Sequence, residues 1–157
     1  MHMTKKYVNL DHARVGHQRA TMERAVQNGA CPFCREHLEQ YHTRPILYET
    51  EYWVLTENFA PYAGSVVHLL LIAKEHVTAP DELSVAAWND LQTVLAHTRS
   101  TFSIPGAALI MRFGDTEYTG ASITHLHAHI VSGVASTKSG QPILVTLGYQ
   151  KEGTTQE

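Results

Sequence analysis

Apolar and polar residues alternate with two different periods along this chain. Six segments alternate or run continuously apolar over a few residues, which is typical of β-strands. The predicted strands cover Ile46–Glu49, Trp53–Glu57 and residues 66–74, 107–113, 123–132 and 142–147. The first two are close enough in sequence to form a hairpin.

Two longer segments repeat apolar residues at helical spacing. Residues 11–28 are predicted to form a helix that begins at Asp11. A second, stronger pattern begins at residues 80–82 and continues to about Ser100. The apolar stripes consist of Val15, Met22 and Val26 in the first segment and of Val85, Trp88, Leu91 and Leu95 in the second. A short helical stretch is also predicted for residues 36–41.

These elements predict one domain of the α+β class, an antiparallel sheet with a long helix packed across it. The domain is expected to span residues 30–149. A helical extension over residues 1–29 would precede it, and a polar tail over residues 150–157 would follow it. A length of 157 residues with 43% hydrophobic residues is sufficient for one globular core.

Composition narrows the range of partners and compartments. The formal net charge of −3 argues against electrostatic capture of a nucleic acid polymer, although local donors can still hold a phosphate group. No apolar run reaches the length of a membrane span, and the first twenty residues lack the apolar core of a signal peptide. Two cysteines are too few for a disulfide framework. We therefore expect a cytoplasmic protein without a membrane partner.

Cys31 and Cys34 have the spacing at which two thiolates can bind one zinc ion. Such a pair can equally be reactive or incidental, and a zinc site needs two further ligands. Four histidines are candidates, two at predicted strand ends and two that directly follow the cysteines: His76 and His125, and His37 and His42. Spacing along the chain does not decide between these two pairs.

The stretch THLHAHIV contains three histidines, His125, His127 and His129, at two-residue spacing. On a strand they would share one face, with neighbours about 7 Å apart and the outer two about 13 Å apart. One tetrahedral zinc ion can bind two of them but hardly all three. A lone strand histidine is usually buried and hydrogen-bonded, but three need a matching set of polar partners. Neutral imidazole attacks phosphorus and a second imidazole can supply a proton, so the row indicates phosphoryl chemistry with divided roles.

Four blocks of the chain, in order, resemble the histidine triad (HIT) superfamily. Residues 120–131 (GASITHLHAHIV) resemble its signature, and residues 68–76 (HLLLIAKEH) resemble its second conserved block. Residues 58–61 (NFAP) are similar to the loop before that block, and residues 31–34 (CPFC) to the cysteine pair of the zinc-binding members. The resemblance covers roughly residues 30–133 and is far more specific than the histidine row alone.

The resemblance implies a small α+β fold, usually a homodimer joined through its sheet, that hydrolyses or transfers nucleotides. The expected substrate is a purine nucleotide, either a nucleoside phosphoramidate or a dinucleoside polyphosphate. By resemblance, His127 attacks the α-phosphorus and carries a covalent nucleotidyl intermediate, and His129 assists the leaving group. Ser122 and the backbone of Gly120 would hold phosphate oxygens. Because the attacking imidazole must be neutral, activity is expected to fall below about pH 6.5.

The resemblance also assigns the remaining site residues. Asn58 would hold the ribose hydroxyls, and His68 would line the same pocket. The ligands of a structural zinc ion in the zinc-containing relatives correspond to Cys31, Cys34, His76 and His125. No role is implied for the residues before residue 30.

Several positions depart from the family pattern. They are Gly114 and Asp115 near a frequent asparagine, Ala73 for a usual proline, Ser132 and Gly133 for a frequent Pro-Arg, and two extra residues in the loop of residues 62–67. The missing asparagine and Pro-Arg favour an alternative function, a nucleotide-binding sensor or scaffold with little turnover. A third hypothesis makes the histidine row a catalytic metal site, with two ligands from the row and a distant third.

Overall fold

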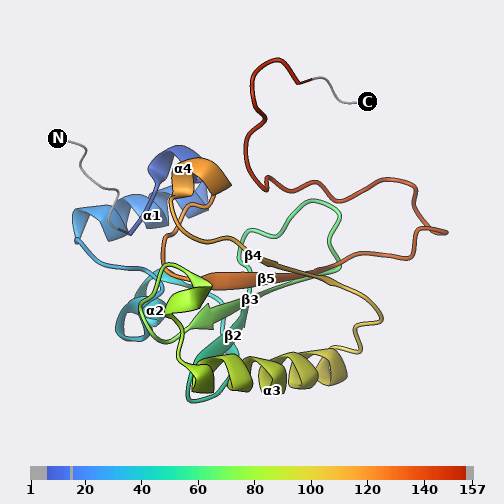
Figure 1. Cartoon of the computed structure of the whole chain (residues 1–157), viewed down its shortest axis with the longest axis horizontal. Coiled ribbons are helices and arrows are strands. Elements are labelled where there is room, and N and C mark those ends of the chain that lie inside the picture. Colours follow the sequence, from blue (N-terminus) through green and yellow to red (C-terminus); the bar gives the residue numbers. More distant parts are fainter. Residues whose placement is uncertain (1–6, 15, 155–157) are drawn as a thin grey trace.

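The computed structural model describes residues 7–14 and 16–154 and has the predicted α+β architecture (Figure 1). Five antiparallel strands form one sheet in the order β1-β2-β3-β5-β4. The strands are β1 Ile46–Glu49, β2 Trp53–Glu57, β3 Val67–Ala73, β4 Ala108–Met111 and β5 His127–Ser132. The helices are α1 His17–Gln27, α2 Arg35–Tyr41, α3 Val85–Thr101 and α4 Thr116–Thr119, with 3-10 turns η1 Leu10–His12 and η2 Pro80–Glu82.

The two faces of the sheet are covered by different parts of the chain. Side chains alternate along a strand, so Leu69 and Leu71 of β3 join the hydrophobic cluster beneath α3. Leu70 and Ile72 of the same strand join a second cluster with Met22 and other N-terminal residues. In Figure 1, α3 lies along one side of the sheet, and α1 and α4 lie on the other side. The residues on this second face form the candidate site.

Helix α3 begins at Val85, later than predicted, because residues 80–82 form the separate 3-10 turn η2. The predicted apolar stripe is right at Leu91 and Leu95, which pack on the core, and wrong at its other two positions. The first turn of α3 is capped by Ser84, whose side chain accepts a hydrogen bond from the Ala87 N–H. The indole of Trp53 donates to the Ala87 carbonyl and fixes the helix on β2. The buried residues of α3 are Ala87, Leu91, Val94 and Thr98. Val85 and Trp88 are 76% and 42% exposed, because small residues allow the closer approach to the sheet.

The N-terminal helix is shorter than predicted. Residues 10–12 form a 3-10 turn capped by Asn9, and α1 begins only at His17, after Gly16 with a φ of +85°. Such a positive φ breaks a right-handed helix. Met22 of the predicted stripe is buried, whereas Val26 is 47% exposed. Val15 lies outside the described residues.

Strand β5 begins at His127, later than predicted, so His125 lies outside it. The preceding Ile123 instead forms an isolated bridge with Val8 of the N-terminal segment. Because the strand begins only at His127, His125 is separated from the two histidines that lie on β5.

The predicted strand over residues 142–147 was wrong. This segment has no regular secondary structure and Leu144 is 80% exposed. Its Thr146 carbonyl does not pair with a neighbouring strand and instead accepts a hydrogen bond from the side chain of Arg112. The side chain of Ile143 lies against Gly64 and Gly133. Within the described residues, no helix is both long and apolar enough to cross a bilayer.

Candidate functional site: a metal cluster beside a histidine pocket

Four side chains from distant parts of the chain form one compact cluster of possible metal ligands. One atom each of Cys31, Cys34, His76 and His125 lies within 4.8 Å of all the others. The Nδ1 atom of His125 is 3.4 Å from Cys31 Sγ and 3.1 Å from His76 Nδ1, and Cys34 Sγ is 3.2 Å from His76 Nδ1. Ligands of a tetrahedral zinc ion are about 3.4–3.8 Å apart, given bonds of about 2.1 Å to nitrogen and 2.3 Å to sulfur. The cluster therefore fits zinc in size and in ligand type.

The orientation of His125 also suits metal binding. Its Nε2 donates to the Ala73 carbonyl, so in the neutral ring the lone pair is on Nδ1, which faces the thiols. The two competing histidines are engaged elsewhere. The Nδ1 of His37 bonds to the Cys31 carbonyl, and the Nε2 of buried His42 bonds to the Thr56 hydroxyl.

The protonation state of the two thiols depends on whether a cation is close to them. Burial and the neighbouring Cys31 raise the pKa of the Cys34 thiol to about 12, and burial raises the pKa of Cys31 as well. Both thiols therefore remain protonated when no positive charge is close. A divalent metal ion reverses this preference because it stabilises the thiolates directly.

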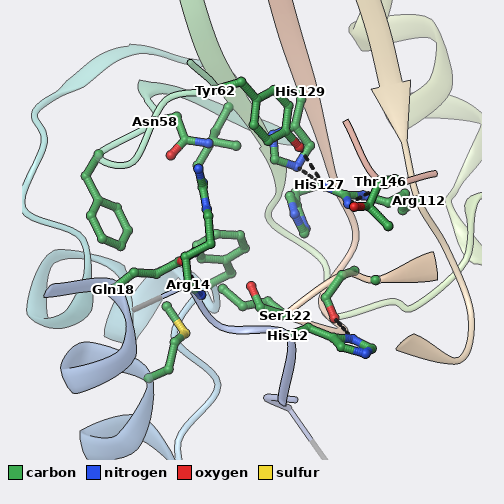
Figure 2. Close-up of a pocket in the computed structure, with 17 residues that line it drawn as sticks. His12, Arg14, Gln18, Asn58, Tyr62, Arg112, Ser122, His127, His129 and Thr146 are labelled. Atoms are coloured by element: carbon green, nitrogen blue, oxygen red, sulfur yellow. Dashed lines mark hydrogen bonds between the residues drawn. The ribbon is translucent and has the colours of Figure 1, made fainter. Parts of the chain in front are cut away.

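Beside the cluster, on the face of the sheet opposite α3, lies a pocket with a volume of about 150 Å³ (Figure 2). It is lined by β-sheet residues, by the loop after α4 and by the N-terminal segment. The lining residues are His12, Arg14, Gln18, Met22, Phe33, Asn58, Phe59, Tyr62, Leu70, Arg112, Gly120, Ala121, Ser122, Ile123, His127, His129 and Thr146. Five of the six residues expected to hold a nucleotide or act on it line this pocket.

His127 is buried at the base of the pocket, and its hydrogen bonding fixes its tautomer. Its Nδ1 lies 2.8 Å from the His125 carbonyl, which can only accept, so Nδ1 carries the proton and Nε2 the lone pair. The ring of Phe33 packs edge-to-face against the imidazole of His127, with 4.9 Å between the two ring centroids. Burial and the charge of Arg112 lower the pKa of His127 to about 4. The imidazole is therefore neutral at physiological pH and has the form of a nucleophile.

His129 is held by a chain of hydrogen bonds that starts at a backbone amide. The Tyr62 N–H donates to His68 Nδ1 at 3.0 Å, which leaves the proton of neutral His68 on Nε2. That Nε2 lies 2.9 Å from His129 Nδ1, which must accept, so the proton of His129 is on Nε2. His68 differs from expectation: it lies behind His129 and is not among the described residues that line the pocket. Its contacts indicate that it orients His129.

The other expected residues lie around the same space. Gly120 ends α4 with a φ of +70°, and a side chain there would meet Thr146 at 2.9 Å, so the position requires glycine. Ser122 follows it at the edge of the pocket (Figure 2). Buried Asn58 accepts a hydrogen bond from the Ala60 N–H, and its amide nitrogen lies 3.0 Å from His68.

Two arginines and the N-terminal residues of the pocket were missed in the sequence. Arg112 follows β4 directly, and its Nη2 donates to the Tyr62 hydroxyl at 2.8 Å and lies 3.3 Å from His129 Nε2. Arg14 reaches the pocket from the segment before α1, with its guanidinium 5.5 Å from the centre of the Tyr62 ring. A basic residue at the end of an apolar strand was the available sign for Arg112. No feature of the sequence around Arg14 indicated a role in the pocket, and Arg14 is 98 residues from Arg112 along the chain.

Comparisons with known proteins identify the family and the fold of the chain. A family model described as the HIT domain matches residues 39–135, more than half of the chain and all five strands. The fold is similar to that of a HIT family hydrolase from Clostridium thermocellum, with 26% identity, a TM-score of 0.52, and coverage of 68% of this chain and 91% of that one. A hypothetical histidine triad nucleotide-binding protein from Sulfolobus tokodaii is 21% identical, with a TM-score of 0.53 and coverage of 78% and 82%. No curated protein matches the chain.

Proposed function

The chain belongs to the HIT domain family, and on that basis we propose that it is a nucleotide hydrolase or nucleotidyltransferase. It acts at the α-phosphate of a purine nucleotide through a covalent nucleotidyl intermediate on His127. The observation that carries this proposal is the buried, neutral imidazole of His127, whose Nε2 lone pair is not used by its backbone hydrogen bond. The similarity to a HIT family hydrolase at 26% identity supports it.

In the first step, Nε2 of His127 forms a bond to the α-phosphorus while the bond to the leaving group breaks. The electron pair of that bond goes to the leaving group. Because the strand and the His125 carbonyl hold the ring, in-line attack needs little reorganisation, and such positioning can supply up to about 7–11 kcal/mol. Water then attacks the same phosphorus and gives up one proton to bulk solvent, the bond between phosphorus and Nε2 breaks with its electron pair returning to Nε2, and His127 leaves as the neutral imidazole with its Nδ1 proton retained.

The other residues of the pocket would stabilise charge and orient the substrate. The Nε2–H of His129 and the hydroxyl of Ser122 would donate to the phosphate oxygens, at about 3–4 kcal/mol for one well-placed donor. The backbone N–H of Gly120, which was expected to do the same, donates to the Thr116 carbonyl instead. His68 acts as a positioning residue through His129. Asn58 is proposed to hold the ribose. Zinc at Cys31, Cys34, His76 and His125 would be structural, because all four protein ligands complete a closed tetrahedral site.

Measurements of turnover and of the effect of a chelator distinguish the proposed enzyme from two alternatives, a sensor or scaffold and a metal hydrolase. A sensor or scaffold would bind AMP without converting a dinucleoside triphosphate or a nucleoside phosphoramidate. A metal hydrolase that uses the row would lose activity at once with a chelator, before its fold is affected. The proposed enzyme turns over at least one substrate and remains active for as long as it stays folded in the chelator. Rates measured with and without chelator, together with circular dichroism of the same samples, decide between the three.

The pH profile provides a separate prediction. Burial, with the charges of Arg14 and Arg112, lowers the pKa of His68 to about 4, and burial, His127 and Arg112 also lower the pKa of His129. A lowered histidine pKa keeps the neutral form down to lower pH. We therefore expect kcat/KM to change by less than about threefold between pH 7.5 and 5.5, with the acidic limb below pH 5 rather than near the ordinary value of about 6.5. A limb at 6.5 in protein that is still folded would contradict the lowered pKa values of these buried histidines.

We also propose that the protein is a homodimer that joins through the β4 edge of the sheet. Leu109 of β4 is 47% exposed, and a hollow of about 330 Å³ lies between this strand and the end of α3. Leu109→Asp is expected to convert the dimer to a monomer in sedimentation velocity at micromolar concentration. Leu144→Asp, at an 80% exposed position elsewhere, is the matched control and should remain dimeric. Wild-type protein that sediments as a 17.5 kDa monomer would contradict the proposal.

A further inference from the structure

Two guanidinium groups reach the pocket from distant parts of the chain. Arg14 and Arg112 both line it, and no aspartate or glutamate is among its described lining residues. Neither guanidinium has a carboxylate partner within the part of the chain that the structure describes. The two charges also repel one another, since Arg112 contributes to lowering the pKa of Arg14, after burial. A bound anion would relieve this repulsion.

Arg112 has donor capacity that the protein does not use. Its Nη2 donates to the Tyr62 hydroxyl and its Nη1 to the Thr146 carbonyl at 3.0 Å. Its Nε is buried and has no partner among the described residues. A guanidinium carries five N–H donors, and an unpaired buried donor is costly.

The contact between Arg112 and His129 points to an acceptor that both would share. Because His129 Nδ1 accepts from His68, the His129 Nε2 carries a proton, and it lies 3.3 Å from Arg112 Nη2. Two donors face each other there, and the oxygen that bridges the α-phosphate to the leaving group, which becomes anionic as it departs, can accept from both. In Figure 2, Arg112 lies beside His129 at one side of the pocket, and Arg14 approaches from the other, with His127 between them in this view.

We infer that Arg112, together with Arg14, forms a second anion site that holds a negatively charged leaving group. This inference rests on the proposed function and makes it more specific. The substrate class is then nucleotides whose α-phosphate is joined through a bridging oxygen to a further phosphate, as in dinucleoside polyphosphates. Nucleoside phosphoramidates, whose leaving group is an amine, are the poorer substrates.

The chemistry of departure agrees with this class. When His127 attacks, the bond between phosphorus and bridging oxygen breaks, and the electron pair stays on that oxygen. A phosphate or nucleoside diphosphate can leave as an anion, with its charge held by the guanidinium groups and with no proton needed. An amine must gain a proton as it leaves, and His129, kept neutral by burial and its charged neighbours, is a weak source of one.

The test compares two substrates that differ in the leaving group, diadenosine triphosphate and adenosine 5′-phosphoramidate. Arg112→Gln is expected to lower kcat/KM for the triphosphate by about 10–100-fold and for the phosphoramidate by less than about threefold. Arg14→Gln should act in the same direction with a smaller effect. The matched control is Arg24→Gln, which removes an exposed guanidinium of α1 and should change neither rate. An equal loss on both substrates would mean that Arg112 only supports the fold, and would overturn the inference.

Binding gives a second readout that needs no turnover. Calorimetry should show that wild-type protein binds ADP at least about tenfold more tightly than AMP, and that Arg112→Gln removes this difference. Equal affinities of the wild type for ADP and AMP would refute the second anion site even if the enzyme is active. Conversely, tighter ADP binding without turnover of either substrate would refute the proposed enzyme and leave the anion site standing.

Discussion

Replacing His127 by Ala is expected to lower the rate of nucleotide turnover by at least about 10³–10⁴-fold. The imidazole supplies the atom that attacks phosphorus, and the described neighbours of His127 offer no second nucleophile in the same position. His129 cannot substitute, because its Nδ1 faces His68 and its Nε2 carries a proton. The effect should appear in kcat, whereas the Kd for AMP should change by less than about threefold. Steady-state kinetics and calorimetry on the same preparations provide both numbers.

Two control variants test whether the loss of activity in His127→Ala comes from the missing imidazole or from a disturbed fold. His127→Gln retains most of the buried volume beside Phe33 and should be as inactive as His127→Ala. His97→Ala removes a histidine of α3 that stacks on Tyr48, away from the pocket, and should keep the wild-type rate. If His127→Ala retains a rate near that of the wild type, the nucleophile has been assigned to the wrong residue.

Removing both thiols by Cys31→Ser and Cys34→Ser is expected to abolish zinc binding and to destabilise the protein strongly. A metal ion that binds only the folded state, at about 1,000 times its Kd, contributes about 4 kcal/mol to the free energy of unfolding. For a chain of this length, that loss lowers Tm by about 8–16 °C. The expected zinc content falls from about one ion per chain to none, because the two histidines alone make a weak site. Elemental analysis and thermal unfolding, on protein purified without metal-affinity steps, measure both effects.

His37→Ala is the matched control for the metal site. His37 follows the cysteines closely but bonds to the Cys31 carbonyl instead of facing the cluster. The variant should retain its zinc and most of its stability, whereas His125→Ala should lose both. Wild-type protein that is fully folded and free of metal would contradict the structural role of the site.

Features set by local sequence could be predicted. The apolar pattern identified all five strands. The continuous apolar run of β3 has its physical reason in the structure, where Leu69 and Leu70 belong to the clusters on opposite faces of the sheet. The resemblance named the metal cluster, in which Cys31 and His125 are 94 residues apart, because family motifs contain information on long-range contacts that spacing alone does not. The buried stripe of α3 was predicted correctly at Leu91 but wrongly in its first turn, where hydrophobicity favoured Val85 and Trp88 over the small Ala87.

What could not be predicted depends on how separate elements pack. Arg14 reaches the pocket only because the N-terminal segment folds back over the sheet, where Asn9 donates to Thr116 across 107 residues. Thr146 reaches it because the segment predicted as a sixth strand crosses the pocket and offers its carbonyl to Arg112. Tautomers are equally hidden in a sequence, since a single backbone N–H at Tyr62 determines which nitrogen of His129 carries the proton.

The most direct test of the central claim is mass spectrometry of protein quenched in acid-free denaturant during turnover of diadenosine triphosphate. The proposed mechanism predicts an adenylyl adduct on the peptide that contains His127, absent from His127→Ala and lost when the substrate is exhausted. Trapping should be strongest within the first turnover, before water resolves the intermediate. Turnover at the wild-type rate with no adduct on His127 at any time, or an adduct on another residue, would contradict the account.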